Sequence, residues 1–167
     1  MTSVRRAIPD DLSLLPAIEV AAGALFREIG LDAIADDDPP TVDELMAAEA
    51  LWVAEVDGAV VGYARAELVG GQAHLEQLSV HPDHGGRGLG TALIETVVTW
   101  ACDRGDAAVT LTTFRAVSFN APLYTKRGFA EVPEADWSAA IRALVAAEAA
   151  HGLDPTTRVV MRRPTRP

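Results

Sequence analysis

Residues 77–92 read QLSVHPDHGGRGLGTA and combine three local patterns. The apolar Leu78 and Val80 alternate with polar neighbours, as in a strand. The Pro-, Asp- and Gly-rich segment 82–88 is typical of a tight turn, and apolar residues at helical spacing begin at Leu89. A helix that starts there leaves its first amides unpaired at the positive end of its dipole. Because glycine allows positive φ and close approach by another molecule, the turn predicts a phosphate-binding site.

The composition predicts a single acidic domain. The chain has 167 residues, of which 49% are hydrophobic, enough for a sizeable core. Its formal net charge of −10 disfavours binding to nucleic acid and would attract cations such as amines. There is neither an apolar run long enough for a membrane nor a signal-peptide hydrophobic region, and the single Cys102 fits a reducing compartment. We therefore expect a cytoplasmic protein that does not bind membranes.

The segments around the turn predict a mixed arrangement of helices and strands. Pro16 interrupts an apolar stripe at helical spacing, so it should kink that helix or split it in two. Asp57-Gly58 and Gly70-Gly71 mark tight turns in an antiparallel meander. The strand after the turn's helix should lie parallel to the strand before it. The expected elements are a strand at 4–7, helices at 12–29 and 41–50, strands at 51–56, 59–68 and 72–80, a helix at 89–104, a strand at 107–113, a helix at 118–127, a strand at 129–132, a helix at 137–148 and a strand at 158–162.

Two common nucleotide-binding motifs do not fit the turn. The dinucleotide fingerprint G-x-G-x-x-G fails at its third glycine, where the chain has Thr91 or Leu93, depending on the starting glycine. A P-loop needs a lysine at the position of Thr91. Nucleotide hydrolysis is therefore not expected, and measured NAD(P) binding would be needed to revive a dinucleotide-dependent oxidoreductase.

Two motifs resemble those of the GNAT superfamily, the acyl-CoA-dependent N-acetyltransferases. Residues 80–90, VHPDHGGRGLG, resemble its motif A, with Gly85 where the family has Arg or Gln. Residues 120–129, NAPLYTKRGF, resemble its motif B, which typically ends in Leu-Tyr-x-x-x-Gly-Phe. The resemblance covers nearly the whole chain. It implies a GNAT-like α/β (α+β) fold, with a mixed, mostly antiparallel central sheet of about six to seven strands flanked by helices. We expect one such domain over residues 1–167, with a helical insertion at 133–155 and a frayed tail at 163–167.

The resemblance implies acetyl-CoA as the co-substrate. Its pyrophosphate suits the backbone amides from Gly86 to Thr91, and its pantetheine arm suits the strand end 78–80, where the Val80 amide would polarise the thioester carbonyl. No metal is expected, because His81 and His84 have no second ligand cluster. The residues expected to bind the cofactor are Leu78, Ser79, Val80, Gly86, Arg87, Gly88, Leu89, Gly90, Thr91 and Asn120.

Two residues are candidates for the chemistry. The resemblance implies that Tyr124 protonates the departing thiolate, although a tyrosine on a helix can also be a core residue. Glu76 is the leading candidate for the base that deprotonates the amine, directly or through water, and its alternative is an ordinary solvent-facing residue. The predicted function is transfer of an acetyl group from acetyl-CoA to a small primary amine by direct attack in a ternary complex, and the acidic charge favours an amine of cationic character. The alternative is a non-catalytic acyl-CoA-binding or partner-binding domain, and a homodimer is left open.

Overall fold

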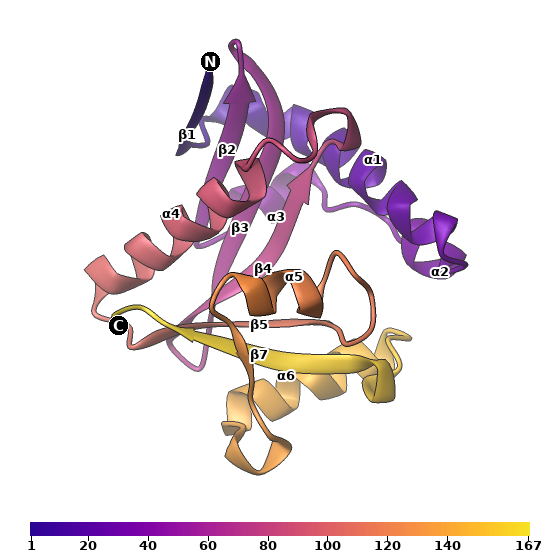
Figure 1. The fold of residues 1–167 in the computed structure, drawn as a ribbon, viewed down its shortest axis with the longest axis vertical. Helices are drawn as coiled ribbons and strands as arrows, with labels where there is room; N and C mark the ends of the chain where they lie inside the picture. The colour runs from indigo at the N-terminus through magenta and orange to yellow at the C-terminus, as the bar shows by residue number, and fades with distance from the viewer. The chain divides into compact units, whose positions relative to one another are not determined.

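The structure is a computed structural model that describes all of residues 1–167 (Figure 1). Seven strands, six α-helices and four short 3₁₀ helices follow one another along the chain. The strands are β1 (Thr2–Arg6), β2 (Ala50–Val56), β3 (Ala59–Val69), β4 (Gln72–Val80), β5 (Ala108–Phe114), β6 (Ala130–Glu131) and β7 (Arg158–Pro164). The α-helices are α1 (Leu15–Glu28), α2 (Asp32–Ala35), α3 (Val42–Met46), α4 (Leu89–Arg104), α5 (Ala121–Lys126) and α6 (Ala139–Ala150). The 3₁₀ helices are η1 (Pro9–Leu14), η2 (Pro82–His84), η3 (Glu134–Asp136) and η4 (Pro155–Thr157).

The seven strands form one mixed sheet in the order β1-β2-β3-β4-β5-β7-β6. β1 with β2, β2 with β3, β5 with β7, and β6 with β7 are antiparallel, whereas β4 and β5 pair in parallel. The parallel pair arises because α4 carries the chain across from one strand to the next. The prediction of a mixed sheet of about six to seven strands flanked by helices is confirmed.

The predicted hairpin turns have the backbone that their residues favour. Asp57 and Gly58 both have positive φ, 49° and 83°, as a two-residue turn between twisted antiparallel strands requires. Gly70 and Gly71 repeat this pattern between β3 and β4, with φ of 60° and 77°. As a result, β3 and β4 begin and end within one residue of the expected strand boundaries.

Contacts between residues divide the chain into two compact units. The N-terminal unit contains residues 1–66 and 77–96, and the C-terminal unit contains residues 67–76 and 97–167. The boundaries between the units fall within β3, β4 and α4, so each of these elements supplies residues to both units.

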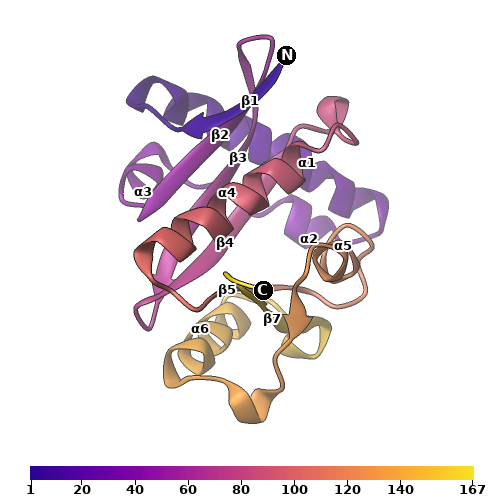
Figure 2. The ribbon, with the colours of Figure 1, turned by 60° about the vertical axis from the view of Figure 1, so that its left-hand side comes forward.

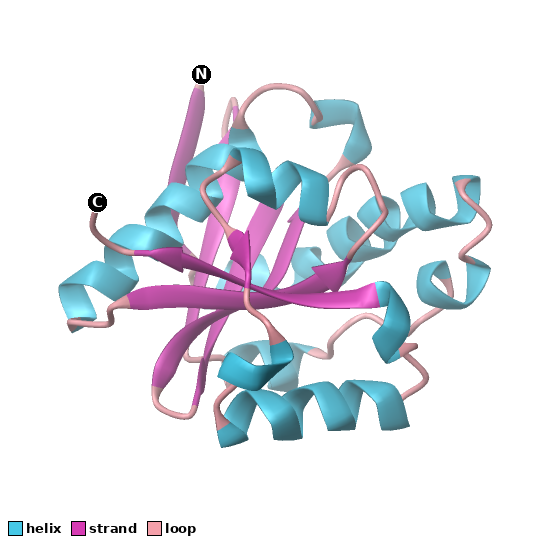
Figure 3. Cartoon of the chain, turned by 60° about the horizontal axis from the view of Figure 1, so that its bottom comes forward, coloured by secondary structure: helices cyan, strands magenta, loops and turns pink.

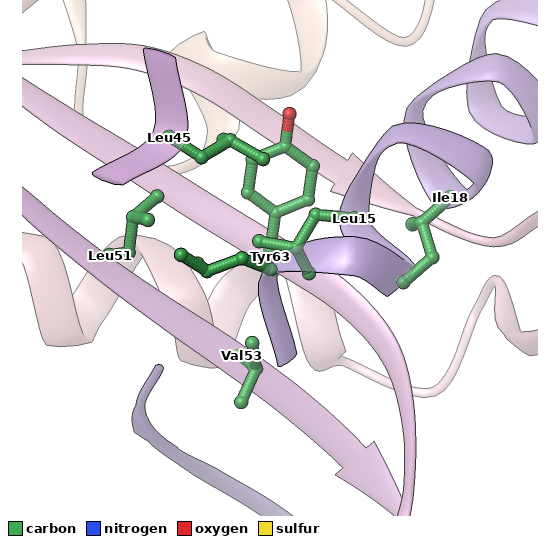
Figure 4. Close-up of a cluster of buried hydrophobic side chains, with 7 residues drawn as sticks. Leu15, Ile18, Leu45, Leu51, Val53 and Tyr63 are labelled. Carbon is green, nitrogen blue, oxygen red and sulfur yellow. The ribbon is translucent and has the colours of Figure 1, made fainter. Parts of the chain in front are cut away.

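Apolar side chains from η1, α1, α3 and the meander form the core of the N-terminal unit (Figure 4). Tyr63 on β3 is fully buried in it, and its hydroxyl donates a hydrogen bond of 2.5 Å to a carboxylate oxygen of Glu19 on α1. The phenol therefore keeps a polar partner although its ring is in the core. The cluster comprises Leu12, Leu15, Ile18, Leu45, Leu51, Val53 and Tyr63.

Pro16 splits the first predicted helix into two segments. η1 ends at Leu14, and α1 begins at Leu15 with the proline in its first turn. A proline is tolerated there because the first amides of an α-helix have no partner within the helix. β1 pairs with β2 at the edge of the sheet (Figure 2).

The C-terminal unit is built on the long antiparallel pair β5 and β7 (Figure 3). Between β6 and β7 the chain forms η3, α6 and η4, where helix was expected, and the Ser138 hydroxyl caps α6 by accepting from the amide of Ile141. β7 continues to Pro164 instead of ending at Arg162, because it pairs with β5 along its whole length. Thr165 then donates from its amide and its hydroxyl to the carbonyls of Ala107 and Asp106, so the expected frayed tail is ordered at its start. None of the helices in the chain combines the length and the apolar character that crossing a membrane requires.

Candidate functional site

The glycine turn begins where β4 ends, in the N-terminal unit. The amide of His81 donates to the carbonyl of Val61 on β3 at 2.8 Å, which holds the start of the turn against the sheet. η2 follows, and Gly86 and Gly88 then take left-handed backbone angles, with φ of 72° and 78°. Residues with side chains rarely adopt these angles, so both glycines are needed for this path of the chain.

The turn delivers the chain into the start of α4, a helix of 16 residues. The amide of Ala92 donates to the carbonyl of Gly88 at 3.0 Å, which is the first turn of helical hydrogen bonding. Amides ahead of such a bond have no acceptor within the helix, and the helix dipole makes their end of the helix positive. Gly86, Arg87 and Gly88 are exposed at this end, so an anion from solvent can reach it.

Gly85 does not need to be glycine for conformational reasons. Its φ of −62° and ψ of 157° are available to any residue. A Cβ built there would lie 3.2 Å from the carbonyl oxygen of Pro82, a tight contact with backbone. The missing arginine or glutamine therefore removes a side chain from the turn without changing the course of its backbone.

The strand end Leu78–Val80 offers its backbone more than its side chains. Ser79 is buried, and its hydroxyl accepts a hydrogen bond of 2.9 Å from the side-chain amide of Gln77. Leu78 and Val80 are partly exposed. The neighbouring strand passes so close that a Cβ at Gly62 would lie 2.9 Å from the Ser79 carbonyl oxygen. The Ser79 hydroxyl is thus bonded within the strand, and the Ser79 carbonyl lies against β3.

Tyr124 and Asn120 lie together at α5, in the C-terminal unit. The amide of Tyr124 donates to the carbonyl of Asn120 at 3.0 Å, and the Asn120 side-chain oxygen accepts from the Thr113 hydroxyl at 2.6 Å. The Tyr124 ring packs edge to face on Phe129, with ring centres 5.7 Å apart. The residue is partly exposed, yet desolvation raises the pKa of its hydroxyl, so the phenol is protonated at neutral pH. It therefore carries the proton that a general acid needs.

Glu76 lies in the same unit, on β4, beside a buried histidine. Its side chain is 41% exposed, whereas that of His74 is 2% exposed, and 3.8 Å separates His74 Nε2 from a Glu76 carboxylate oxygen. The other ring nitrogen, Nδ1, lies 2.8 Å from the hydroxyl oxygen of Thr110 on β5. Burial lowers the pKa of His74 to about 4, so its ring is neutral at physiological pH. His74 and Glu76 lie two residues apart and share a face of β4, whereas the contact with Thr110 depends on the pairing of β4 with β5.

The predicted site residues thus fall in two groups. The residues from Leu78 to Thr91 lie in the N-terminal unit, and Glu76, Asn120 and Tyr124 lie in the C-terminal unit. No group of histidine, cysteine or acidic side chains in the chain is arranged to hold a metal ion.

Comparison with known proteins identifies the family. The acetyltransferase (GNAT) family matches residues 22–129, a range that contains the glycine turn, Glu76 and Tyr124. The chain belongs to this family. The GNAT resemblance of the two motifs is therefore confirmed.

Relatives of this GNAT chain carry acetyltransferase names. It is 33% identical over 128 residues to the probable N-acetyltransferase family 8 member 5 of Mus musculus, a match that covers 70% of this chain and 54% of that protein. The matches to curated relatives span between 12% and 54% of those proteins' own lengths.

Solved structures share the fold of this GNAT chain. A GCN5-related N-acetyltransferase from Rhodopseudomonas palustris has a TM-score of 0.70 at 22% identity and covers 98% of this chain and 96% of its own. The PaiA N-acetyltransferase of Thermoplasma acidophilum, in complex with coenzyme A, has a TM-score of 0.66 at 15% identity, covering 98% and 99%. At these identities the likeness shows the fold.

Proposed function

We propose that this protein transfers an acetyl group from acetyl-CoA to a primary amine by direct attack in a ternary complex. The observation that carries the proposal is the turn at Gly86 and Gly88, whose left-handed backbone leads into the exposed start of α4. Family membership supports it, as does a structural neighbour of the same fold in complex with coenzyme A.

The residues of the turn fit the pyrophosphate of acetyl-CoA. The backbone amides from Gly86 to Thr91 would donate to phosphate oxygens, and the Arg87 guanidinium adds positive charge at the exposed end of α4. Leu78 and Val80 would pair their backbone with the amide groups of the pantetheine arm, with Ser79 contributing main-chain atoms alone. We assign Leu89, Gly90 and Asn120 to the same cofactor. Asn120 would contact it through its side-chain NH2, because its side-chain oxygen accepts from the Thr113 hydroxyl.

The acid and base roles belong to two residues of the C-terminal unit. Acetyl-CoA supplies a thioester, whose carbonyl carbon bonds to the amine nitrogen as its bond to sulfur breaks. The Glu76 carboxylate removes a proton from the substrate ammonium, directly or through water, so that the nitrogen has a free lone pair. The Tyr124 hydroxyl, whose pKa is raised and which is therefore protonated, gives its proton to the departing thiolate. The acylated nitrogen then loses its second proton, which passes through water to the tyrosinate and restores Tyr124. The backbone amide of Val80 stabilises the negative charge on the carbonyl oxygen.

The acceptor is a small amine of cationic character. The formal net charge of −10 is the feature that favours it, because an acidic surface raises the local concentration of cations. A non-catalytic acyl-CoA-binding domain is the second candidate, favoured by Gly85, which leaves the turn without the Arg or Gln side chain of the family motif.

Tyr124→Phe tests the proposal in an assay of CoA release across classes of amine. The variant should lower kcat by about 100-fold, the low end for general acid catalysis, because a thiolate is already a stable leaving group. Its affinity for acetyl-CoA should hold. The chain has only two tyrosines, and Tyr63→Phe is the matched control, because it removes a buried hydroxyl that bonds Glu19 and takes no part in the chemistry. Binding of acetyl-CoA without CoA release for any amine would establish the non-catalytic candidate instead.

A further inference from the structure

His74 sits where its imidazole touches both the proposed base and a hydroxyl on the next strand. Its residue exposure is 1%, compared with 5% for Asp11, the other buried residue that can carry a charge near neutral pH. Nδ1 lies 2.8 Å from Thr110 Oγ1, and Nε2 lies 3.8 Å from a Glu76 carboxylate oxygen. The proposed chemistry assigns His74 no role, although burying an imidazole costs free energy unless its nitrogens have polar partners.

The strand register places these groups. His74 and Thr110 are direct partners in the parallel pairing of β4 with β5, so their side chains stand next to each other on one face of the sheet. Glu76 is two residues along β4 and therefore projects from that same face. The order Thr110, His74, Glu76 thus follows from the pairing of two strands and needs no loop.

The electrostatics of this row select one tautomer of the ring. A neutral imidazole has one N–H donor and one acceptor nitrogen. If Nδ1 carried the proton, the Nε2 lone pair would face the Glu76 carboxylate, which is repulsive. If Nε2 carries it, the N–H dipole points toward the carboxylate, and the Thr110 hydroxyl donates to Nδ1. The second arrangement satisfies both nitrogens.

We propose that His74, held as its Nε2–H tautomer by the Thr110 hydroxyl, is a positioning residue that orients the Glu76 carboxylate for proton removal from the amine. This deepens the proposed function and rests on it. At a separation of 3.8 Å the N–H attracts the carboxylate, and the 41% exposure of the Glu76 side chain leaves the carboxylate accessible to a substrate. No covalent step occurs on His74. The amine proton moves to Glu76 and leaves from there to solvent.

Nitrogen NMR of histidine-labelled full-length protein tests the tautomer without any activity. The chain has four histidines, and His74→Asn assigns the signal. We expect the Nε2–H tautomer of a ring that stays neutral until the pH approaches its pKa of about 4. Thr110→Ser should keep this tautomer, and Thr110→Val should lose it. An Nδ1–H tautomer, or a ring that gains its proton near the ordinary pKa of about 6.5, overturns the proposal.

Steady-state kinetics with an accepted amine test the positioning role. His74→Asn should lower kcat by about 10-fold, as losses of outer-shell partners typically do, with the KM for acetyl-CoA unchanged. His74→Gln should recover part of kcat, because its longer side chain carries an N–H donor closer to Glu76. Thr110→Ser should outperform Thr110→Val.

Val109→Ala is the control for loss of packing. Val109 is fully buried on β5, next in sequence to Thr110, and faces the other side of the sheet. Equal losses of kcat in Val109→Ala and His74→Asn would show that His74 only supports the fold, and would overturn the proposal. If no amine led to CoA release by the wild-type protein, the proposed function would fail instead, and the NMR result on the tautomer would be unaffected.

Discussion

Asp11 is a buried carboxylate that ties the start of η1 to the edge of the sheet. It is 5% exposed and accepts two hydrogen bonds from the Arg5 guanidinium, at 2.7 and 3.1 Å, and one from the amide of Ile8 at 2.8 Å. Hydrogen bonding to Arg5 lowers the pKa of Asp11 more than burial raises it, and the Ile8 amide lowers it further. These three hydrogen bonds therefore stabilise the charged form of the carboxylate.

We expect Asp11→Asn to lower the free energy of unfolding at neutral pH by about 1.5–3 kcal/mol, the range for hydrogen bonds to charged groups. Because the folded-state pKa of Asp11 lies below its unfolded value of about 3.9, this stabilisation is complete above that value and is lost as the pH falls through the folded-state pKa. Urea unfolding at several pH values measures it. The gap between wild type and variant should close in acid, whereas the exposed neighbour substitution Asp10→Asn should show little gap at any pH. A gap that persists unchanged in acid would contradict the expectation.

Single residues show where prediction from sequence ends. Tyr124 could be chosen from its motif, and Glu76 from its place on a strand that leads to the turn. Thr110 could not, because it is 36 residues from His74 and meets it only through the register of β4 on β5. That register depends on packing across the whole sheet, which local patterns do not encode.

The glycine turn is the element on which cofactor binding should depend, and Gly88→Ala tests it. A Cβ at Gly88 would meet no atom within 4 Å, so the substitution acts only through the backbone φ of 78°. A side chain in this left-handed region costs about 1–2 kcal/mol. The alanine variant should relax out of that conformation, scatter the amides and weaken acetyl-CoA binding by about 10-fold. Isothermal titration with acetyl-CoA gives the change.

Gly58→Ala is the matched control, because Gly58 has φ of 83° and equally open surroundings but lies in the hairpin turn between β2 and β3. It should lower the stability of the protein by a similar amount and leave acetyl-CoA affinity as it is. If both variants bound as tightly as the wild type, the turn would not hold the cofactor. Equal weakening by both would show a general effect of stability.

Element boundaries were predictable where the chemistry of one or two residues sets them. The pairs Asp57-Gly58 and Gly70-Gly71 ended the strands of the meander, and Pro16 divided the first helix. The end of β7 was not predictable in this way. Arg163 and Pro164 have no strand signal of their own, and they are extended because β5 offers a partner as far as Ala108. Tertiary pairing outweighs local preference at such positions.

At the scale of the whole molecule, the fold could be predicted because two motifs and the elements between them occur in one order. Each motif on its own leaves several folds open, since a strand, a turn and a helix recur in many of them. The meander before the turn excludes the fully parallel sheets of dinucleotide-binding folds, and the single crossover through α4 sets one parallel pair in a mostly antiparallel sheet. The acceptor could not be predicted, because amine specificity depends on the shape of a binding surface and not on an order of elements.

Net charge is the one property of the whole chain that bears on the acceptor. The 24 acidic residues exceed the 14 Lys and Arg residues, and the resulting field should speed the encounter with cations and slow the encounter with the anionic acetyl-CoA. Screening weakens both effects, since the Debye length falls from about 30 Å at 0.01 M salt to about 10 Å at 0.1 M.

We therefore expect kcat/KM for the most highly charged amine that the protein accepts to fall several-fold over this range of salt concentration. An accepted amine with a single charge should change less, and kcat/KM for acetyl-CoA should hold or rise. If a polyamine and a monoamine responded to salt in the same way, the acidic surface would serve solubility alone, and the acceptor would be selected by contacts at short range.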